Sequence, residues 1–131
     1  MGNKKVITIF GATGAQGGGL ARSILADPNG PFAVRAVTRD VNSDAARSLE
    51  AAGAEVVAAN LDDAAAVDRA FAGAYGAYCV TFFWAHFSPE RELAEARLMA
   101  QAARAAGVQH VIWSTLEDTR RWMQLDDPRM P

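Results

Sequence analysis

Apolar residues along the chain alternate between short β-branched or aromatic runs and longer segments with helical spacing. The short runs lie between glycine or polar turns, and this arrangement is typical of strands. They predict strands at 6–10, 32–38, 55–58, 77–81 and 108–113. Their nearly continuous apolar character indicates strands that are buried on both faces.

Four segments between these runs carry the signals of helices. The first has apolar helical spacing over 20–25, after a glycine-rich stretch at 11–19. The other three begin at capping residues and end near a glycine, as helices commonly do. The caps are Ser43, then Asp62 or Asp63, then Ser88 before Pro89, and the glycines are Gly53, Gly73 and Gly107.

A regular strand–helix alternation predicts an α/β fold, because parallel strands need crossover helices and such crossovers are right-handed. We expect a Rossmann-type doubly wound parallel sheet of five strands in the order 3-2-1-4-5. Residues 1–118 form the predicted domain. Residues 119–131 form a polar tail in which no closing helix is predicted, so we interpret the sheet as truncated and the tail as leading toward a further part.

The amino-acid composition argues against several classes of protein. The chain has 131 residues, 50% of them hydrophobic, which is enough for one core and argues against disorder. Its net charge of −2 and the lack of a basic block argue against general nucleic-acid binding. No apolar stretch reaches membrane-spanning length, and Cys79 is the one cysteine. We therefore expect no membrane association, no metal site, and a cytoplasmic location.

A glycine motif follows the first predicted strand and opens a helix. Gly11, Gly14 and Gly17 have the spacing of a dinucleotide fingerprint in the strand–turn–helix context that this motif requires. Such glycines permit a tight turn, a close approach of the pyrophosphate and close helix packing, while helix N–H groups face the phosphates. The intervening residues Ala12, Thr13, Ala15 and Gln16 belong to the same predicted loop.

The residue after the second strand decides which nicotinamide cofactor is expected. Arg39 stands about twenty residues beyond the glycines, where NAD-binding domains place an acid for the ribose hydroxyl. A guanidinium pairs with phosphate, so Arg39 favours NADP(H). A shift of one residue would present Asp40 instead and admit NAD(H).

Two further loops follow strands at the same predicted sheet end. Asn60 and Leu61 stand where the adenine is expected, although Asn60 also suits an ordinary loop. Thr81, Phe82 and Phe83, followed by Trp84, would border the second ribose and the nicotinamide. The aromatic residues equally suit a buried role beneath segments that this chain lacks.

Candidates for catalysis are few. Ser114 ends the fifth strand and is placed to hydrogen-bond a substrate or the nicotinamide ribose, but a serine without a base is more often a turn hydroxyl. No Tyr-x-x-x-Lys pair occurs, since the only lysines are Lys4 and Lys5. His86 follows the aromatic run and is positioned to titrate near a substrate, whereas His110 fits a structural role. We expect Cys79 to be a buried thiol.

These motifs together resemble the NmrA-like family, a group of atypical short-chain dehydrogenase/reductase relatives. The resemblance covers residues 4 to about 118. It is carried by residues 10–18 (FGATGAQGG), 37–39 (VTR), 53–57 (GAEVV), 73–75 (GAY) with 80–81 (VT), and 113–117 (WSTLE).

The resemblance implies NADP(H) held by the loop from Gly11 to Gln16, with Arg39 at the 2′-phosphate, Asn60 and Leu61 at the adenine, and residues 81–83 near the second ribose. It also implies a redox-responsive regulator or the cofactor-binding part of a reductase. Three departures stand out: Asn60 replaces an acid of some relatives, Ala94 replaces a lysine, and the family's chain continues further. A reductase for a small carbonyl or quinone, and a module that associates with itself or a partner through an uncovered sheet edge, are the alternatives.

Overall fold

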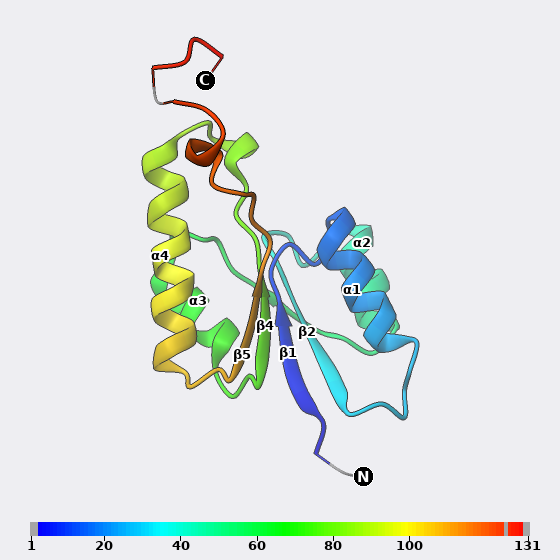
Figure 1. Cartoon of the computed structure of the whole chain (residues 1–131). Helices are drawn as coiled ribbons and strands as arrows, with labels where there is room; N and C mark the ends of the chain where they lie inside the picture. The colour runs from blue at the N-terminus through cyan, green and yellow to red at the C-terminus, as the bar shows by residue number, and fades with distance from the viewer. Residues whose placement is uncertain (1–2, 125, 130–131) are drawn as a thin grey trace.

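A computed structural model describes residues 3–124 and 126–129 of the chain (Figure 1). The strands are β1 (Lys5–Ile9), β2 (Phe32–Thr38), β3 (Glu55–Ala58), β4 (Gly76–Cys79) and β5 (His110–Trp113). The α-helices are α1 (Ala15–Leu25), α2 (Asp44–Ala51), α3 (Ala64–Phe71) and α4 (Pro89–Ala105). Two short 3₁₀ helices, η1 (Phe83–Ala85) and η2 (Thr119–Arg121), follow β4 and β5.

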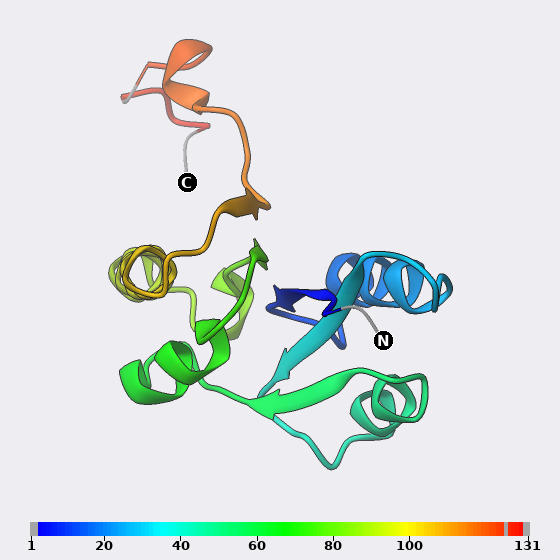
Figure 2. The same cartoon turned by 90° about the horizontal axis from the view of Figure 1, so that it is seen from below.

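All five strands pair in parallel in one sheet of order β3-β2-β1-β4-β5, which confirms the predicted topology. The helices α1 and α2 cover one face of this sheet, and α3 and α4 cover the other (Figure 2). Strands β2 and β3 are added on one side of β1, and β4 and β5 on the other, because β1 pairs with both β2 and β4. The strand order therefore reverses at the boundary between β1 and β4. In α/β folds, ligands bind at the carboxyl ends of strands beside this reversal.

Successive residues of each inner strand enter opposite cores. Ile9 and Tyr78 pack beneath α1 and α2, whereas Phe10 and Cys79 pack beneath α3 and α4. The second core also contains Phe71, whose ring centroid lies 5.0 Å from that of Phe10. The carboxyl end of β1 and the whole of β4 are therefore buried on both faces, which fixes the strand ends that border the site.

The outer strands differ from the sequence prediction. We predicted strands buried on both faces, but β3 has no fully buried residue and three of the four residues of β5 are exposed. Each outer strand pairs on one side only. A continuous run of apolar residues therefore did not predict burial for the two strands at the edges of the sheet.

Helix α1 begins at Ala15, five residues before the apolar spacing predicts it. The reason is tertiary: Gly17 and Gly18 are buried against the end of β1, although glycine disfavours a helix by about 1 kcal/mol relative to alanine. Strand β4 lies at Gly76–Cys79 instead of 77–81, so it begins one residue earlier and ends two residues earlier than expected. Strand β5 begins two residues later than expected, at His110.

Candidate functional site

The turn between β1 and α1 is closed by glycine. Gly11 has φ +62°, which favours glycine, and its carbonyl accepts a 2.9 Å hydrogen bond from the N–H of Gly14. At Gly17 an added Cβ would lie 2.3 Å from the carbonyl oxygen of Gly11. The first turn of α1 consequently packs directly on the backbone of the strand end.

The N-terminus of α1 is open. Its N-cap residue is Gly14, and no side chain caps it, whereas Ser43, Asp63 and Ser88 cap α2, α3 and α4. The first N–H groups of an α-helix have no partner within the helix, and the helix dipole makes this end positive. The turn therefore presents free donors and partial positive charge at the carboxyl end of the sheet.

A cavity of about 280 Å³ lies over this turn. It is bordered by the ends of β1, β2 and β3 and by the aromatic segment after β4. Of the residues predicted to hold NADP(H), six line it: Gly11, Thr13, Gly14, Arg39, Leu61 and Phe82. Asp40, the alternative that would admit NAD(H), lines it as well. A second cavity of about 270 Å³ shares Arg39, Leu61 and Phe82 with it and adds Asn60.

Arg39 is the cationic group at this cavity. The guanidinium carbon lies 5.9 Å from the ring centroid of Phe82, within cation–π range, and Arg39 is exposed. No hydrogen bond or ion pair joins the guanidinium to another residue in the described part of the chain. Asp40, by contrast, is held in its turn, where Oδ1 accepts a 2.9 Å hydrogen bond from the N–H of Asn42. The arginine is thus free to bind an anion.

The remaining predicted residues lie elsewhere. Thr81, Phe83 and Ser114 line a third cavity of about 620 Å³ between the end of β4, the start of α4 and the segment after β5. Ala12 is fully buried, and its N–H donates to the carbonyl of Val37 over 3.3 Å. Ala15, Gln16 and Gly17 form the first turn of α1.

Gln16 ties α1 to two strands, a role that sequence reasoning missed. Its Oε1 accepts hydrogen bonds from the hydroxyl of Tyr78 and, over 2.8 Å, from that of Ser114. Ser114, the catalytic candidate, therefore has its hydroxyl proton engaged by an amide. These residues are 62 and 98 positions apart from Gln16, so no local pattern could have joined them.

His86 lines the second cavity together with Arg39 and Asn60, and both of its ring nitrogens have protein neighbours. Its Nδ1 accepts a 3.0 Å hydrogen bond from the N–H of Ser88, which requires the proton to sit on Nε2. Nε2 lies 3.4 Å from Oε2 of Glu95, and both side chains are almost fully buried. The pair fastens the segment after β4 to α4. His110, predicted to be structural, is the exposed first residue of β5.

The chemistry of Cys79 is that of a buried thiol. Its side chain is fully buried in β4, and burial raises the pKa of Cys79 to about 12. The thiolate needed for nucleophilic attack is therefore not formed near neutral pH.

Among the described residues, no three His, Cys, Asp or Glu side chains gather in a way that would hold a metal ion. A search of the same residues for a helix long and apolar enough to cross a membrane finds none.

A glycine turn leading to an uncapped helix, at the carboxyl end of a parallel sheet with strand order 3-2-1-4-5, defines a Rossmann-type α/β domain. Comparison with known families specifies it further. The model of the NmrA-like family matches residues 3–131, so the chain belongs to this family.

Two curated relatives show the extent of the similarity. The NmrA-like family domain-containing oxidoreductase FrzB of Cladobotryum sp. is 40% identical over 114 residues, which is 84% of this chain and 33% of the relative. The oxidoreductase notA of Aspergillus sp. (strain MF297-2) is 38% identical over 124 residues, covering 89% of this chain and 35% of the relative. The chain thus spans about a third of the length of these relatives.

Solved structures of the NmrA-like family are also similar to this chain. The negative transcriptional regulator Nmra matches with a TM-score of 0.79 and 29% identity, over 92% of this chain and 36% of that protein. Nmra was also solved in complex with NADP, where the TM-score is 0.77, the identity 29%, and the coverage 94% of this chain and 37% of that protein. A further Nmra structure contains NAD, at the same TM-score, identity and coverage.

Proposed function

We propose that this chain binds a nicotinamide dinucleotide, NADP(H) in preference to NAD(H), at the cavity over the β1–α1 turn. The observation that carries the proposal is Arg39: an exposed guanidinium without an ionic partner among the described residues, on the wall of a cavity whose floor is a glycine turn. An arginine in this place suits the 2′-phosphate that distinguishes NADP from NAD. Binding of both cofactors by Nmra structures supports the class of ligand.

The residues that line these cavities fit a nicotinamide dinucleotide. The pyrophosphate would lie at the open end of α1, where a side chain at Gly14 or Gly17 would approach the carbonyl of Gly11 to 3.2 or 2.3 Å. The ring of Phe82 lies beside Arg39 at cation–π distance, and Asn60 and Leu61 would border the adenine. Thr81 and Phe83 face the third cavity, so they would meet only the nicotinamide end.

We further propose that this chain is the cofactor-binding part of a redox-responsive regulator or of an atypical reductase, located in the cytoplasm. Bound NADPH would supply a hydride, but a reductase also needs a proton donor. The hydroxyls of Ser114 and Tyr78 both donate to Gln16, which favours the regulatory role. The oxidoreductase names of the relatives favour the alternative, a reductase for a small carbonyl or quinone.

Calorimetric titration of the chain with NADPH and NADH tests cofactor binding. We expect NADPH to bind at least about tenfold more tightly, a difference of about 1.4 kcal/mol. Arg39→Ala should abolish the difference, because it removes the group that pairs with the 2′-phosphate. Arg97→Ala is the matched control: it removes an exposed arginine on α4 outside the three cavities and should leave both affinities unchanged.

Two results would contradict the proposal. If neither nucleotide binds to a chain whose circular dichroism shows it folded, the glycine turn is only a structural connection. If NADPH and NADH bind equally and Arg39→Ala weakens both, the 2′-phosphate assignment is wrong. Consumption of NADPH with a panel of quinones and aldehydes would separate the reductase from the regulator.

A further inference from the structure

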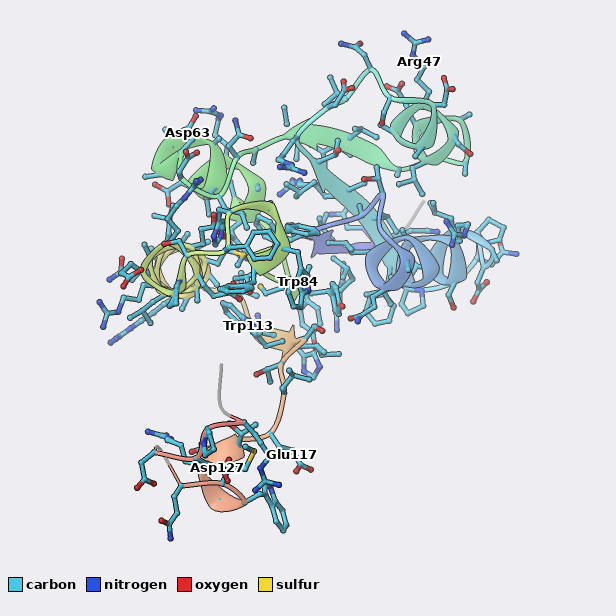
Figure 3. All side chains as sticks on the ribbon, turned by 90° about the horizontal axis from the view of Figure 1, so that it is seen from above. Arg47, Asp63, Trp84, Trp113, Glu117 and Asp127 are labelled. Atoms are coloured by element: carbon cyan, nitrogen blue, oxygen red, sulfur yellow. The ribbon has the colours of Figure 1, made fainter. Side chains whose placement is uncertain are left out.

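The second cavity, of about 270 Å³, adjoins the cavity over the β1–α1 turn and extends it toward α4. Arg39, Leu61 and Phe82 line both cavities. The rest of the second cavity comes from the loop after β3, the segment after β4 and the first turns of α4: Asn60, Asp62, Ala85, His86, Arg91 and Glu95. Figure 3 looks down on the carboxyl ends of the strands and shows the segment that carries Trp84 between α4 and the end of β1. A flat group that extends past Phe82 therefore meets side chains of α4.

The proposed function places the adenine at this second cavity, beside Asn60 and Leu61, and the inference below rests on that function. Purine bases differ at position 6 of the ring. Adenine carries a 6-amino group there, which donates hydrogen bonds, whereas guanine and hypoxanthine carry a 6-oxo group, which accepts them. Selection of adenine therefore requires a protein group that accepts hydrogen bonds and cannot donate them.

Most polar side chains of the cavity do not meet this requirement. The amide of Asn60 has both an acceptor and donors, so it can turn to suit either base. Asp62 and Arg91 are exposed, and water can take the place of a partner that the base does not supply. Both ring nitrogens of His86 already have protein neighbours. The remaining group is the carboxylate of Glu95.

Glu95 is 8% exposed and has a fixed position in α4. Its Oε2 lies 3.4 Å from Nε2 of His86, whose Nδ1 accepts a 3.0 Å hydrogen bond from the N–H of Ser88. Its Oε1 has no hydrogen-bond donor in the described part of the chain, and it is not among the side-chain oxygens that the protein covers completely. Since Glu95 lines the cavity, a donor on a bound base can reach this second oxygen. An ionised carboxylate only accepts hydrogen bonds, and in a buried place little water replaces a missing donor.

We propose that Glu95 makes the site specific for dinucleotides with a 6-amino purine, because its Oε1 accepts a hydrogen bond from the 6-amino group of the adenine. A 6-oxo purine brings a second acceptor to the same oxygen, and two facing acceptors repel one another. Arg39 selects the 2′-phosphate and does not distinguish the bases. The two residues thus select different parts of the same cofactor.

The test compares NADPH with the reduced nicotinamide hypoxanthine dinucleotide phosphate, in which a 6-oxo purine replaces the adenine. Calorimetric titration of the unmodified chain near neutral pH should show NADPH binding at least about tenfold more tightly, as expected for a hydrogen bond to a charged group. Equal affinities would overturn this inference and leave the proposed function intact. Tighter binding of the hypoxanthine dinucleotide would assign the base to a donor such as Arg91 and would also overturn it. If neither dinucleotide binds to the folded chain, the proposed function fails as well.

Glu95→Gln tests the residue itself. The amide oxygen of the glutamine can replace Oε2 beside His86, which leaves its NH₂ group toward the cavity as a donor for a 6-oxo group. The preference for NADPH over the hypoxanthine dinucleotide should therefore vanish or reverse, while the preference for NADPH over NADH stays. A purely structural role of Glu95 would instead weaken all three dinucleotides alike. Glu90→Gln, at an exposed glutamate of the same helix outside the three cavities, is the matched control and should change no preference.

A second substitution separates the two carboxylates of the cavity. Asp62→Asn removes the exposed carboxylate and should leave the base preference within about twofold of its original value. Loss of the preference in Asp62→Asn but not in Glu95→Gln would mean that the assignment to Glu95 is wrong. Should Glu95→Gln not fold, Glu95→Asp decides the outcome: it keeps the charge but withdraws it by one methylene, so an unchanged base preference in that variant would overturn the proposal.

Discussion

At the residue scale, the glycines of the β1–α1 turn are not equivalent. An added Cβ at Gly17 would lie 2.3 Å from the oxygen and 2.8 Å from the carbon of the Gly11 carbonyl, both rigid backbone atoms. At Gly19, two residues later on the same helix, no atom lies within 4 Å of an added Cβ. The sequence motif does not display this difference, because both glycines stand in one run.

We therefore expect opposite effects from two alanine substitutions. Gly17→Ala should lower the free energy of unfolding by about 1–3 kcal/mol, because the strand end and helix must separate. Gly19→Ala should raise it by up to about 1 kcal/mol through helix propensity. Urea unfolding followed by circular dichroism measures both. Equal shifts in the two variants would mean that α1 does not pack on the strand as described.

Cys79 links burial to reactivity and to pH. The pKa of its thiol is raised to about 12 by burial, whereas an unfolded cysteine has a pKa of about 8.5. Because the folded pKa is the higher one, stability from this group is complete below about pH 8.5 and declines as pH rises toward 12. The thiol should accordingly react with a disulfide reagent at about pH 8 only after unfolding.

Rates of thiol labelling in buffer and in urea check this prediction. A chain with Cys79→Ala and Ser48→Cys supplies the comparison, since Ser48 is exposed on α2 and its replacement should react at once. Rapid labelling of Cys79 in the folded chain would contradict its burial.

At the candidate site, the sequence could predict those residues whose type and position in a motif indicate a role by themselves. The glycines and Arg39 were predicted from spacing alone, and the structure places Gly11, Gly14 and Arg39 on the wall of one cavity; that they bind a cofactor stays a prediction. The partnership of Glu92 with Thr81, and of His86 with Glu95, was not found. Such pairs depend on how a loop folds back on a helix, and no periodicity in the sequence encodes that geometry.

At the element scale, capping decided most helix starts. Ser43 and Ser88 were predicted as caps and are caps, each accepting a hydrogen bond from a backbone N–H three residues later. The start of α3 was ambiguous, because Asp62 and Asp63 are adjacent and both residue types cap well. The structure resolves the ambiguity: Oδ1 of Asp63 accepts a 3.1 Å hydrogen bond from the N–H of Ala66.

Substitution of the two aspartates tests this assignment. Asp63→Ala should lower the free energy of unfolding by about 1 kcal/mol through loss of the cap. Asp62→Ala removes the same charge one residue earlier and should change it by less than about 0.5 kcal/mol. Thermal or urea unfolding of both variants gives the comparison, and a larger loss from Asp62→Ala would shift the helix start by one residue.

Helix α1 shows where element prediction fails. Its apolar spacing begins at Leu20, but the helix begins at Ala15, and Gly17 in its first turns packs where a larger side chain would collide with the Gly11 carbonyl. Local propensity and tertiary packing oppose one another here, and packing prevails. A further glycine, Gly14, is the N-cap and leaves the helix without a side-chain cap, so the departure from local preference lies beside the proposed phosphate site.

At the scale of the whole molecule, the strand order followed from the alternation of elements, but the state of the sheet edges did not. At the β3 edge, Arg35 forms a 2.8 Å ion pair with Glu55 and also donates to carbonyls at the end of α3. Charges of this kind discourage pairing between sheets. The β5 edge has no Lys, Arg, Asp or Glu, and Val111 and Ile112 are 43% and 54% exposed.

This asymmetry predicts association through one edge. Unpaired backbone groups beside exposed apolar residues favour pairing with a second strand, so the isolated chain should self-associate through β5 as its concentration rises. Ile112→Lys places a charge on that strand and should shift the chain toward monomer in light scattering. Val41→Lys adds the same charge at an exposed valine between β2 and α2 and should not. If the chain stays monomeric at every concentration, the exposed β5 edge does not cause association, although it lacks the charges that the β3 edge carries. The self-association alternative would then be rejected.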